Sequence, residues 1–439
     1  MRSHISNIAY GLLDYAAYPA AMLIAAPELV HHLGTAKYGI WLIASAAVGA
    51  GSLVSSGFGD AVIQRVASLR ASNDHEGIRR IIGNMLCLNL MLGTLLAMVL
   101  WVVIPFIAAR IAHFDPTQIE PSKWSLRVGA LLIVLKSIES VFISAQRAFE
   151  SYAPAARIAL AAKVLAVLIA VVLARNGYGV PALMVGTCLV VAFGMICQRT
   201  ALQAHLGART VKAAFDRDTF FDLISFGGFT WLQAVAGVLF SQADRLLLGI
   251  TIGASAVAYY GVSVQMAQPI HGLTAAGLHF LFPHLSTRFA ASRMSGVRRP
   301  ILIALALNVG AALALLAGVM LIGPRLLRLW MGKEFADQSA GILPLLAIGF
   351  CFLAFNVTGH YALLAIGKVR LVTALNVAGG TAMLFVMAFS VPDYGVRGAA
   401  WGRLCYGVIT CFLYIPLFRQ LRNSRSLPAL VVRVATEEA

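Results

Sequence analysis

The sequence predicts an all-α membrane protein with about twelve transmembrane helices. Sixty per cent of its 439 residues are hydrophobic and only 12 per cent are charged. The mean hydropathy of +0.83 is far above that of soluble domains. The apolar residues also gather in runs of about 20, the length that a helix needs to cross the hydrocarbon core of a bilayer. We therefore expect lipid to be the main solvent of the folded chain.

Twelve such runs follow one another along the chain. We expect the first six spans near residues 8–30, 38–56, 82–109, 126–146, 155–174 and 180–198. We expect the second six near residues 220–240, 256–278, 301–323, 341–366, 369–391 and 396–418. The first run is longer than a signal-peptide core and has no Ala-x-Ala site leading into a soluble domain, so we interpret it as a retained span.

The two sets of six spans resemble each other. Residues 177–180 (GYGV) match residues 393–396 (DYGV) at an offset of 216, and residues 33–39 resemble residues 252–261 with a small gap. The repeat predicts two lobes of six helices with a substrate route between them. The expected divisions are an N-terminal lobe (1–205), a cytoplasmic linker (206–218), a C-terminal lobe (219–423) and a cytoplasmic tail (424–439).

The basic residues predict the orientation. Of the 34 lysines and arginines, twenty-one fall in loops on one side of the membrane, ten fall on the other side and three lie inside spans. Because cytoplasmic loops are enriched in these residues, we expect both termini in the cytoplasm of a multi-pass inner-membrane protein. Each half then begins on the same side, so the two repeats are parallel.

Catalysis, metal binding and nucleic-acid binding have little support in the sequence. There is no nucleotide-binding loop, no HExxH zinc motif and no GxSxG nucleophile motif, and the expected loops are too short for a catalytic domain. The six cysteines lie in apolar runs without a CxxC pair. No basic patch is interleaved with aromatic residues as a nucleic-acid surface requires. We expect a protein that is not an enzyme and holds no metal or cofactor.

The fourth span carries the main candidate site. Lys136, Glu139 and Arg147 share one helix face at about 100° per residue, and Ser140 joins them. Ionisable residues within spans are costly and mark candidate pathways, so this face predicts a wet, partly cationic stripe that could hold a phosphate or an acidic sugar. Alternatively, Lys136 and Glu139 form a pair that locks helices together, and Arg147 extends to the cytoplasmic surface.

Asp14 is a second candidate, for ion coupling. Asn7 and Asp14 align on the first span with Tyr18 beside them. Prolines in the same span could bend it into a moving gate whose carboxylate exchanges a proton or sodium ion. A static hydrogen bond between helices is an equal alternative for Asp14. Glu139 is the other ion-coupling candidate.

Other polar positions within or near the spans are weaker candidates. Lys163 and Arg403, in the fifth and twelfth spans, could each line a cavity in its own half or extend to the surface. The pair Asp244-Arg245 is expected at the outer end of the seventh span as a structural anchor, as are Asp60 and Arg65 near the second. The histidines are expected to be neutral and hydrogen-bonded: His271, His279, His284 and His360.

Several segments resemble the polysaccharide transporter family, the Wzx-type flippases of the MOP exporter superfamily. They are residues 33–41 (LGTAKYGIW), 57–65 (GFGDAVIQR), 244–249 (DRLLLG), 253–260 (GASAVAYY), 281–283 (LFP) and 394–402 (YGVRGAAWG). The likeness spans nearly the whole chain. These motifs are small and aromatic residues at turns, so they are specific for the superfamily and weak for the substrate.

The resemblance implies a V-shaped pair of six-helix lobes, similar to MATE transporters. It implies a flippase that moves an undecaprenyl-pyrophosphate-linked oligosaccharide from the cytoplasmic to the periplasmic leaflet by alternating access, for O-antigen, capsule or exopolysaccharide assembly. A proton or sodium gradient could drive it, and a glycan polymerase and chain-length proteins could be its partners beside membrane lipids. Alternatives are an ion-coupled multidrug or metabolite antiporter of the same superfamily, a membrane enzyme of glycan polymerisation or ligation, and a scaffold for glycan assembly.

Overall fold

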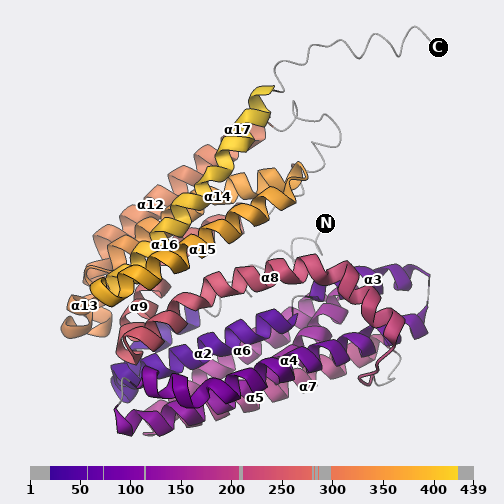
Figure 1. Ribbon diagram of the computed structural model, residues 1–439, viewed down its shortest axis with the longest axis horizontal. Coiled ribbons are helices and arrows are strands. Elements are labelled where there is room, and N and C mark those ends of the chain that lie inside the picture. Colours follow the sequence, from indigo (N-terminus) through magenta and orange to yellow (C-terminus); the bar gives the residue numbers. More distant parts are fainter. Residues whose placement is uncertain are drawn as a thin grey trace.

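A computed structural model of the chain describes residues 20–56, 58–72, 74–112, 115–206, 211–278, 281, 285 and 298–423. Every regular element within these residues is helical (Figure 1). Several of the expected features lie outside them: Asn7, Asp14, Tyr18, His279, His284 and the tail from 424.

The helices of the two halves follow each other with short connections. In the first half they are Ala20–Leu33, α2 (Thr35–Ser56), α3 (Gly59–Ala71), α4 (His75–Ile111), α5 (Pro116–Ala148), α6 (Tyr152–Arg175) and α7 (Val180–His205). In the second half they are α8 (Arg217–Thr251), α9 (Ala254–Ala267), α10 (Pro269–Leu278), α12 (Arg298–Met331), α13 (Lys333–Ser339), α14 (Leu343–Ala365), α15 (Val369–Tyr394), α16 (Val396–Thr410) and α17 (Tyr414–Asn423).

Eight helical segments of the described chain are long and apolar enough to cross a membrane: α4, α5, α6, α7, α12, α14, α15 and the continuous stretch Val396–Arg422. The chain is therefore a multi-pass membrane protein. The other four predicted spans correspond to the apolar helix Ala20–Leu33, to α2, to α8, and to α9 together with α10. The total of twelve spans and the side on which the termini lie stay predictions.

Two expected spans are not uniform α-helices. The eighth is divided into α9 and α10 at Pro269, which has no backbone N–H and whose ring clashes with the preceding turn. The twelfth tightens into a 3-10 turn over Cys411–Leu413, just before Pro416, and then continues as α17. Hydropathy could not reveal either break, because the residues on both sides are apolar.

Aspartates begin several of the helices. The Asp74 carboxylate accepts a hydrogen bond from the Gly77 N–H at 2.8 Å, and Asp115 caps α5 in the same way. At the start of α8, Asp216 accepts from the Thr219 hydroxyl at 2.5 Å and from its N–H at 3.1 Å. These hydrogen bonds lower the pKa of the Asp216 carboxyl. The caps explain why α4, α5 and α8 begin where they do.

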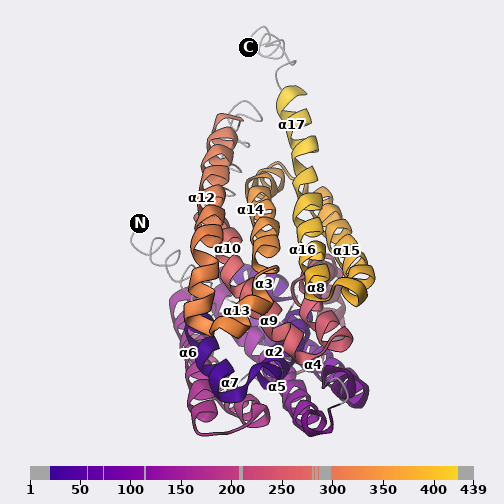
Figure 2. The ribbon, with the colours of Figure 1, turned by 90° about the vertical axis from the view of Figure 1, so that its left-hand side faces the viewer.

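The helices form two lobes that are joined at one end and diverge toward the other (Figures 1 and 2). Helices α2 to α7 make one lobe and α9 to α17 the other, while α8 packs against α2 and α4 of the first lobe and against α15 of the second. At the joined end α2 packs against α9. The fully buried Tyr38 and Tyr260 belong there to one hydrophobic core shared by both lobes.

Glycines permit this junction. A Cβ on Gly39 would overlap the backbone of Ala254, so only a glycine lets α2 and α9 approach so closely. Gly34 and Gly253, which precede these two helices, both have positive φ angles of 82° and 102°. The matching turns agree with the internal repeat, as do the starts of α7 at Val180 and α16 at Val396, which lie 216 residues apart.

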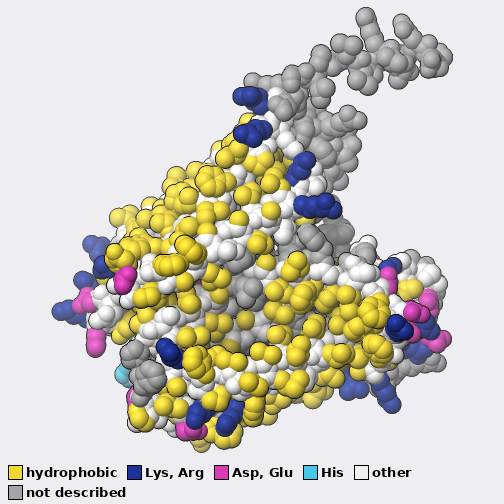
Figure 3. Space-filling view, in the orientation of Figure 1, with side chains coloured by type: hydrophobic (Ala, Val, Ile, Leu, Met, Phe, Trp, Pro, Cys, Tyr) yellow, Lys and Arg dark blue, Asp and Glu magenta, His cyan; other side chains and the backbone are white. Residues whose placement is uncertain are grey.

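The outer surface is that of a membrane protein. Hydrophobic side chains cover the flanks of both lobes, whereas charged side chains gather at the ends (Figure 3). Trp101 and Trp124 are more than half exposed, and the Arg127 guanidinium lies 5.5 Å and 4.9 Å from their rings. Aromatic and basic side chains of this kind are typical of the membrane interface.

Candidate functional site

A cavity of about 570 Å³ lies between α2, α5, α6, α7 and α8. Its polar lining comes from all five helices: Ser45, Ser52, Lys136, Glu139, Ser140, Arg147, Lys163, Thr187, Gln242 and Arg245. Apolar residues such as Val48, Leu132 and Met184 complete the walls. A polar cavity within a membrane lobe is costly unless it serves a polar ligand, so this is the candidate functional site.

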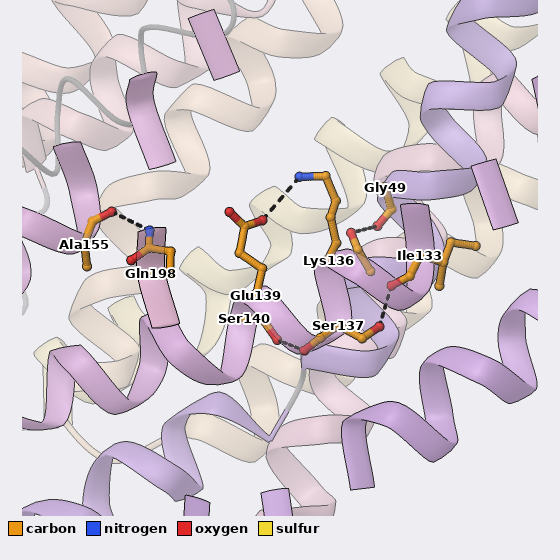
Figure 4. Close-up of polar contacts among 9 residues, drawn as sticks. Gly49, Ile133, Lys136, Ser137, Glu139, Ser140, Ala155 and Gln198 are labelled. Carbon is orange, nitrogen blue, oxygen red and sulfur yellow. Dashed lines mark hydrogen bonds and ion pairs between the residues drawn. The ribbon is translucent and has the colours of Figure 1, made fainter. Parts of the chain in front are cut away.

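Helix α5 supplies the longest row of polar side chains. The row consists of Lys136, Glu139, Ser140 and Arg147. Glu139 and Ser140 follow Lys136 by three and four residues, and Arg147 follows them by eight and seven, so all four lie on the face turned to the cavity. Eleven residues separate Lys136 from Arg147, so the row extends roughly 16 Å along the helix. The Ser140 hydroxyl donates to the Ser137 carbonyl at 2.7 Å, so this polar group is satisfied within its own helix (Figure 4).

Lys136 and Glu139 point toward each other (Figure 4). The Lys136 Nζ lies 3.9 Å from Glu139 Oε2, a loose ion pair. The Glu139 side chain is 8% exposed and that of Lys136 is 34% exposed, so the carboxylate lies in the wall and the ammonium lies more open to the cavity. The carboxylate lies next to α7, since a Cβ on Gly194 would be 3.5 Å from Glu139 Oε1.

Buried amides hold the surrounding helices together. The Gln146 side chain of α5 donates to the Gln198 side-chain oxygen at 2.6 Å and to the Gln198 backbone carbonyl at 3.1 Å. Gln198 of α7 in turn donates to the Ala155 carbonyl of α6 at 3.0 Å (Figure 4). Because both amides are fully buried, this network fixes the three helices that carry most of the site.

The cavity is cationic. Four basic side chains line it: Lys136, Arg147, Lys163 and Arg245. Glu139 is the acidic residue of the described lining, so four positive charges against one negative leave a formal charge of +3. Lysine and arginine donate charge-assisted hydrogen bonds to phosphates and carboxylates, so the arrangement is suited to an anionic group. The neutral hydroxyls and the Gln242 amide could bind sugar hydroxyls.

The structure brings together four of the residues that the sequence predicted: Lys136, Glu139, Arg147 and Lys163. Lys136 and Glu139 pair with each other within α5 and both line the cavity. Ligand contact by these residues stays a prediction. Asp14 lies outside the described residues, so its place relative to the cavity is not described.

Arg403, which was considered as lining for a cavity in the second half, is not among the residues that line this one. Its guanidinium is buried in the second lobe, where it donates to the Asp244 carboxylate and lies 5.6 Å from the Phe350 ring. The Tyr260 hydroxyl donates to the same carboxylate at 2.8 Å. The buried carboxylate requires a cation, which explains why Arg403 points into the helix bundle.

Two lining residues from the second half of the chain, Gln242 and Arg245, were not predicted to lie in a cavity of the first. The apolar run of the seventh span weakens after residue 240, so Arg245 was expected at the end of the span, yet α8 continues to Thr251. Consecutive residues point about 100° apart on a helix, so Asp244 faces Tyr260 and Arg403 while Arg245 faces the cavity. Recognising that the seventh helix continues to residue 251 would have placed Gln242 and Arg245 within the span rather than at its end.

Comparisons with known proteins agree with the fold. A family model described as "Polysaccharide biosynthesis protein" matches residues 29–340. A Shigella flexneri protein described as an O-antigen transporter is 24% identical over 412 residues, which cover 91% of this chain and 93% of that protein.

Two solved structures share the fold. One, described as the lipid II flippase MurJ in an inward closed conformation, has a TM-score of 0.77 at 12% identity and covers 94% of this chain and 87% of its own. The other, an inward-facing multidrug resistance MATE family transporter of the MOP superfamily, has a TM-score of 0.70 at 16% identity and covers 95% and 96%. The family model, which matches more than half of the chain, shows that this chain belongs to the polysaccharide biosynthesis protein family, and the two solved structures show that it has the fold of a MATE family transporter and of MurJ.

Proposed function

We propose that the protein is a flippase that moves an undecaprenyl-pyrophosphate-linked oligosaccharide from the cytoplasmic to the periplasmic leaflet of the inner membrane. The transported unit would serve O-antigen, capsule or exopolysaccharide assembly. The observation that carries the proposal is the cavity with a formal charge of +3 inside a lobe of a transporter fold. No covalent chemistry is needed, since the protein only has to lower the barrier to crossing.

The physical problem of this substrate matches the cavity. A pyrophosphate and its sugars cannot cross hydrocarbon unaided, because each uncompensated polar group there costs several kcal/mol. Cationic side chains such as Lys136 and Lys163 would replace water around the phosphates. The apolar flanks of the lobes (Figure 3) would leave the polyprenyl tail in the bilayer while the head group passes between them.

Alternating access is the proposed motion. The lobes diverge toward the end that carries α3 and α17 (Figure 1). These helices carry basic residues, including Arg65, Arg70, Arg419 and Arg422, so the positive-inside rule supports an opening toward the cytoplasm. Closing that end and parting α2 from α9 would expose the cavity to the periplasm. Glu139 and Asp14 remain proposed sites of proton or sodium coupling, and a glycan polymerase and chain-length proteins remain proposed partners.

A multidrug antiporter is the alternative with a relative of known structure. Organic cations are best held by acidic residues, whereas four of the five ionisable residues of the described lining are basic. The cavity therefore favours an anionic substrate over a cationic drug.

Deletion of the gene tests the proposal. We expect loss of the surface glycan while its lipid-linked repeat unit accumulates on the cytoplasmic face, and we expect wild type but not Lys136→Ala to restore export at equal protein levels. Arg397→Ala, an exposed arginine outside the cavity, is the control and should restore export. Normal surface glycan with greater sensitivity to cationic drugs would contradict the flippase and favour the antiporter.

A further inference from the structure

We infer that Glu139 is a resident competitor for the anion site: its carboxylate pairs with Lys136 in the empty cavity and yields that lysine when an anionic head group binds. This inference rests on the proposed function and adds a role to it. In a site with a formal charge of +3, an anion would bind well but leave slowly. A carboxylate built into the wall would help to release it.

The first observation is the geometry of the pair. Helix α5 contains a second lysine and glutamate three residues apart, Glu120 and Lys123, whose charged atoms are 2.7 Å apart. In the cavity, the same spacing with the lysine before the glutamate leaves Lys136 Nζ and Glu139 Oε2 3.9 Å apart. That separation exceeds the length of a good hydrogen bond. The Lys136 ammonium is thus attracted to Glu139 but can still turn to another anion.

The second observation is the difference in burial within the pair. Glu139 is 8% exposed, and its carboxylate lies beside Gly194 of α7, where a Cβ would be in ordinary van der Waals contact with Glu139 Oε1 at 3.5 Å. Lys136 is 34% exposed and lies on the open side. A ligand phosphate can reach the ammonium from the cavity, but it cannot take the place of the carboxylate. The two anions therefore compete for one lysine.

The charges around Glu139 determine how the competition depends on pH. Lys136 and Arg147 face the cavity from α5, Lys163 from α6 and Arg245 from α8, whereas α2 and α7 contribute no ionisable side chain to the described lining. The Lys136 ammonium lies 3.9 Å from the Glu139 carboxylate. Protonation of Glu139 would cancel its attraction for Lys136 and leave the lysine to the ligand. Acidification should therefore have the same effect as removing the charge of Glu139.

Binding of undecaprenyl pyrophosphate to the purified full-length protein in nanodiscs tests the inference. Glu139→Gln keeps the shape of the side chain and removes its charge. We expect it to bind roughly twofold to fivefold tighter than wild type, and to release the ligand more slowly, because one partly exposed ion pair no longer competes. Glu120→Gln removes the matched carboxylate outside the cavity and should bind like wild type. The advantage of Glu139→Gln should shrink as the pH falls.

Each outcome separates this inference from the function on which it rests. Unchanged or weaker binding by Glu139→Gln, with weaker binding by Lys136→Gln, would overturn the inference and leave the flippase intact. Absence of binding by wild type, or equal binding by wild type and Lys136→Gln, would overturn the proposed anion site and the inference with it. If Glu139→Gln does not fold, wild type and Lys136→Gln suffice: acidification should strengthen binding by wild type more, because the competition exists only where Lys136 is present.

Discussion

The ion pair between Arg403 and Asp244 leads to a quantitative prediction about stability. Arg403→Met keeps a long apolar side chain but leaves the carboxylate of Asp244, whose side chain is 1% exposed, without its cation. Removing one partner of a buried pair costs about 3–5 kcal/mol. With an unfolding entropy of about 2.1 cal/mol/K per residue over a chain of this length, that loss lowers the melting temperature by about 3–5 °C.

Thermal unfolding in detergent, followed by intrinsic fluorescence, measures this shift. Arg397→Met is the matched control, because Arg397 is exposed on the first turn of the same helix and its removal should leave the melting temperature nearly unchanged. The double variant Asp244→Asn with Arg403→Met should recover at least half of the loss, since it buries no unpaired charge. The reasoning is refuted if Arg403→Met melts like wild type, or if the double variant loses the sum of both single losses.

Three further changes test the fold. Gly39→Ala should lower the melting temperature by forcing α2 away from α9, at a cost of about 1–3 kcal/mol. Gly310→Ala is the control, because its added Cβ meets nothing within 4 Å, and it should melt like wild type. Equal melting temperatures for the two variants would contradict the close approach of α2 and α9. Gln198→Leu should cost about 1–3 kcal/mol in the same assay because it removes two buried hydrogen bonds, one from the Gln146 amide and one to the Ala155 carbonyl. An unchanged melting temperature would contradict the network. Because the pKa of Asp216 is lowered, the stabilisation by its ionised carboxylate is fully present above the ordinary carboxyl pKa and is lost as the pH falls through the lowered value. Asp216→Asn should therefore melt below wild type at neutral pH and match it in acid. A difference that persists in acid would contradict the capping role of the carboxylate.

Much of the site was predictable because helix periodicity acts within a single element. The spacing of Lys136, Glu139 and Arg147 places them on one face of any helix, whatever packs against it. The length of the apolar runs similarly predicts membrane spans, since the thickness of the bilayer is the same for each of them. The repeat between residues 177–180 and 393–396 predicts two equivalent lobes, and α7 and α16 begin at equivalent positions.

The sequence by itself thus determined the helical membrane fold, its duplication and the cationic face of α5. Only the tertiary structure decided which side chains meet across helices. It paired Arg403 with Asp244, 159 residues away, and Gln146 with Gln198, 52 residues away, and it turned Arg245 of the second half into a cavity wall of the first. The physical reason is that a local pattern determines the face on which a residue lies, whereas its partner depends on how separate helices pack and on which buried charges must be neutralised.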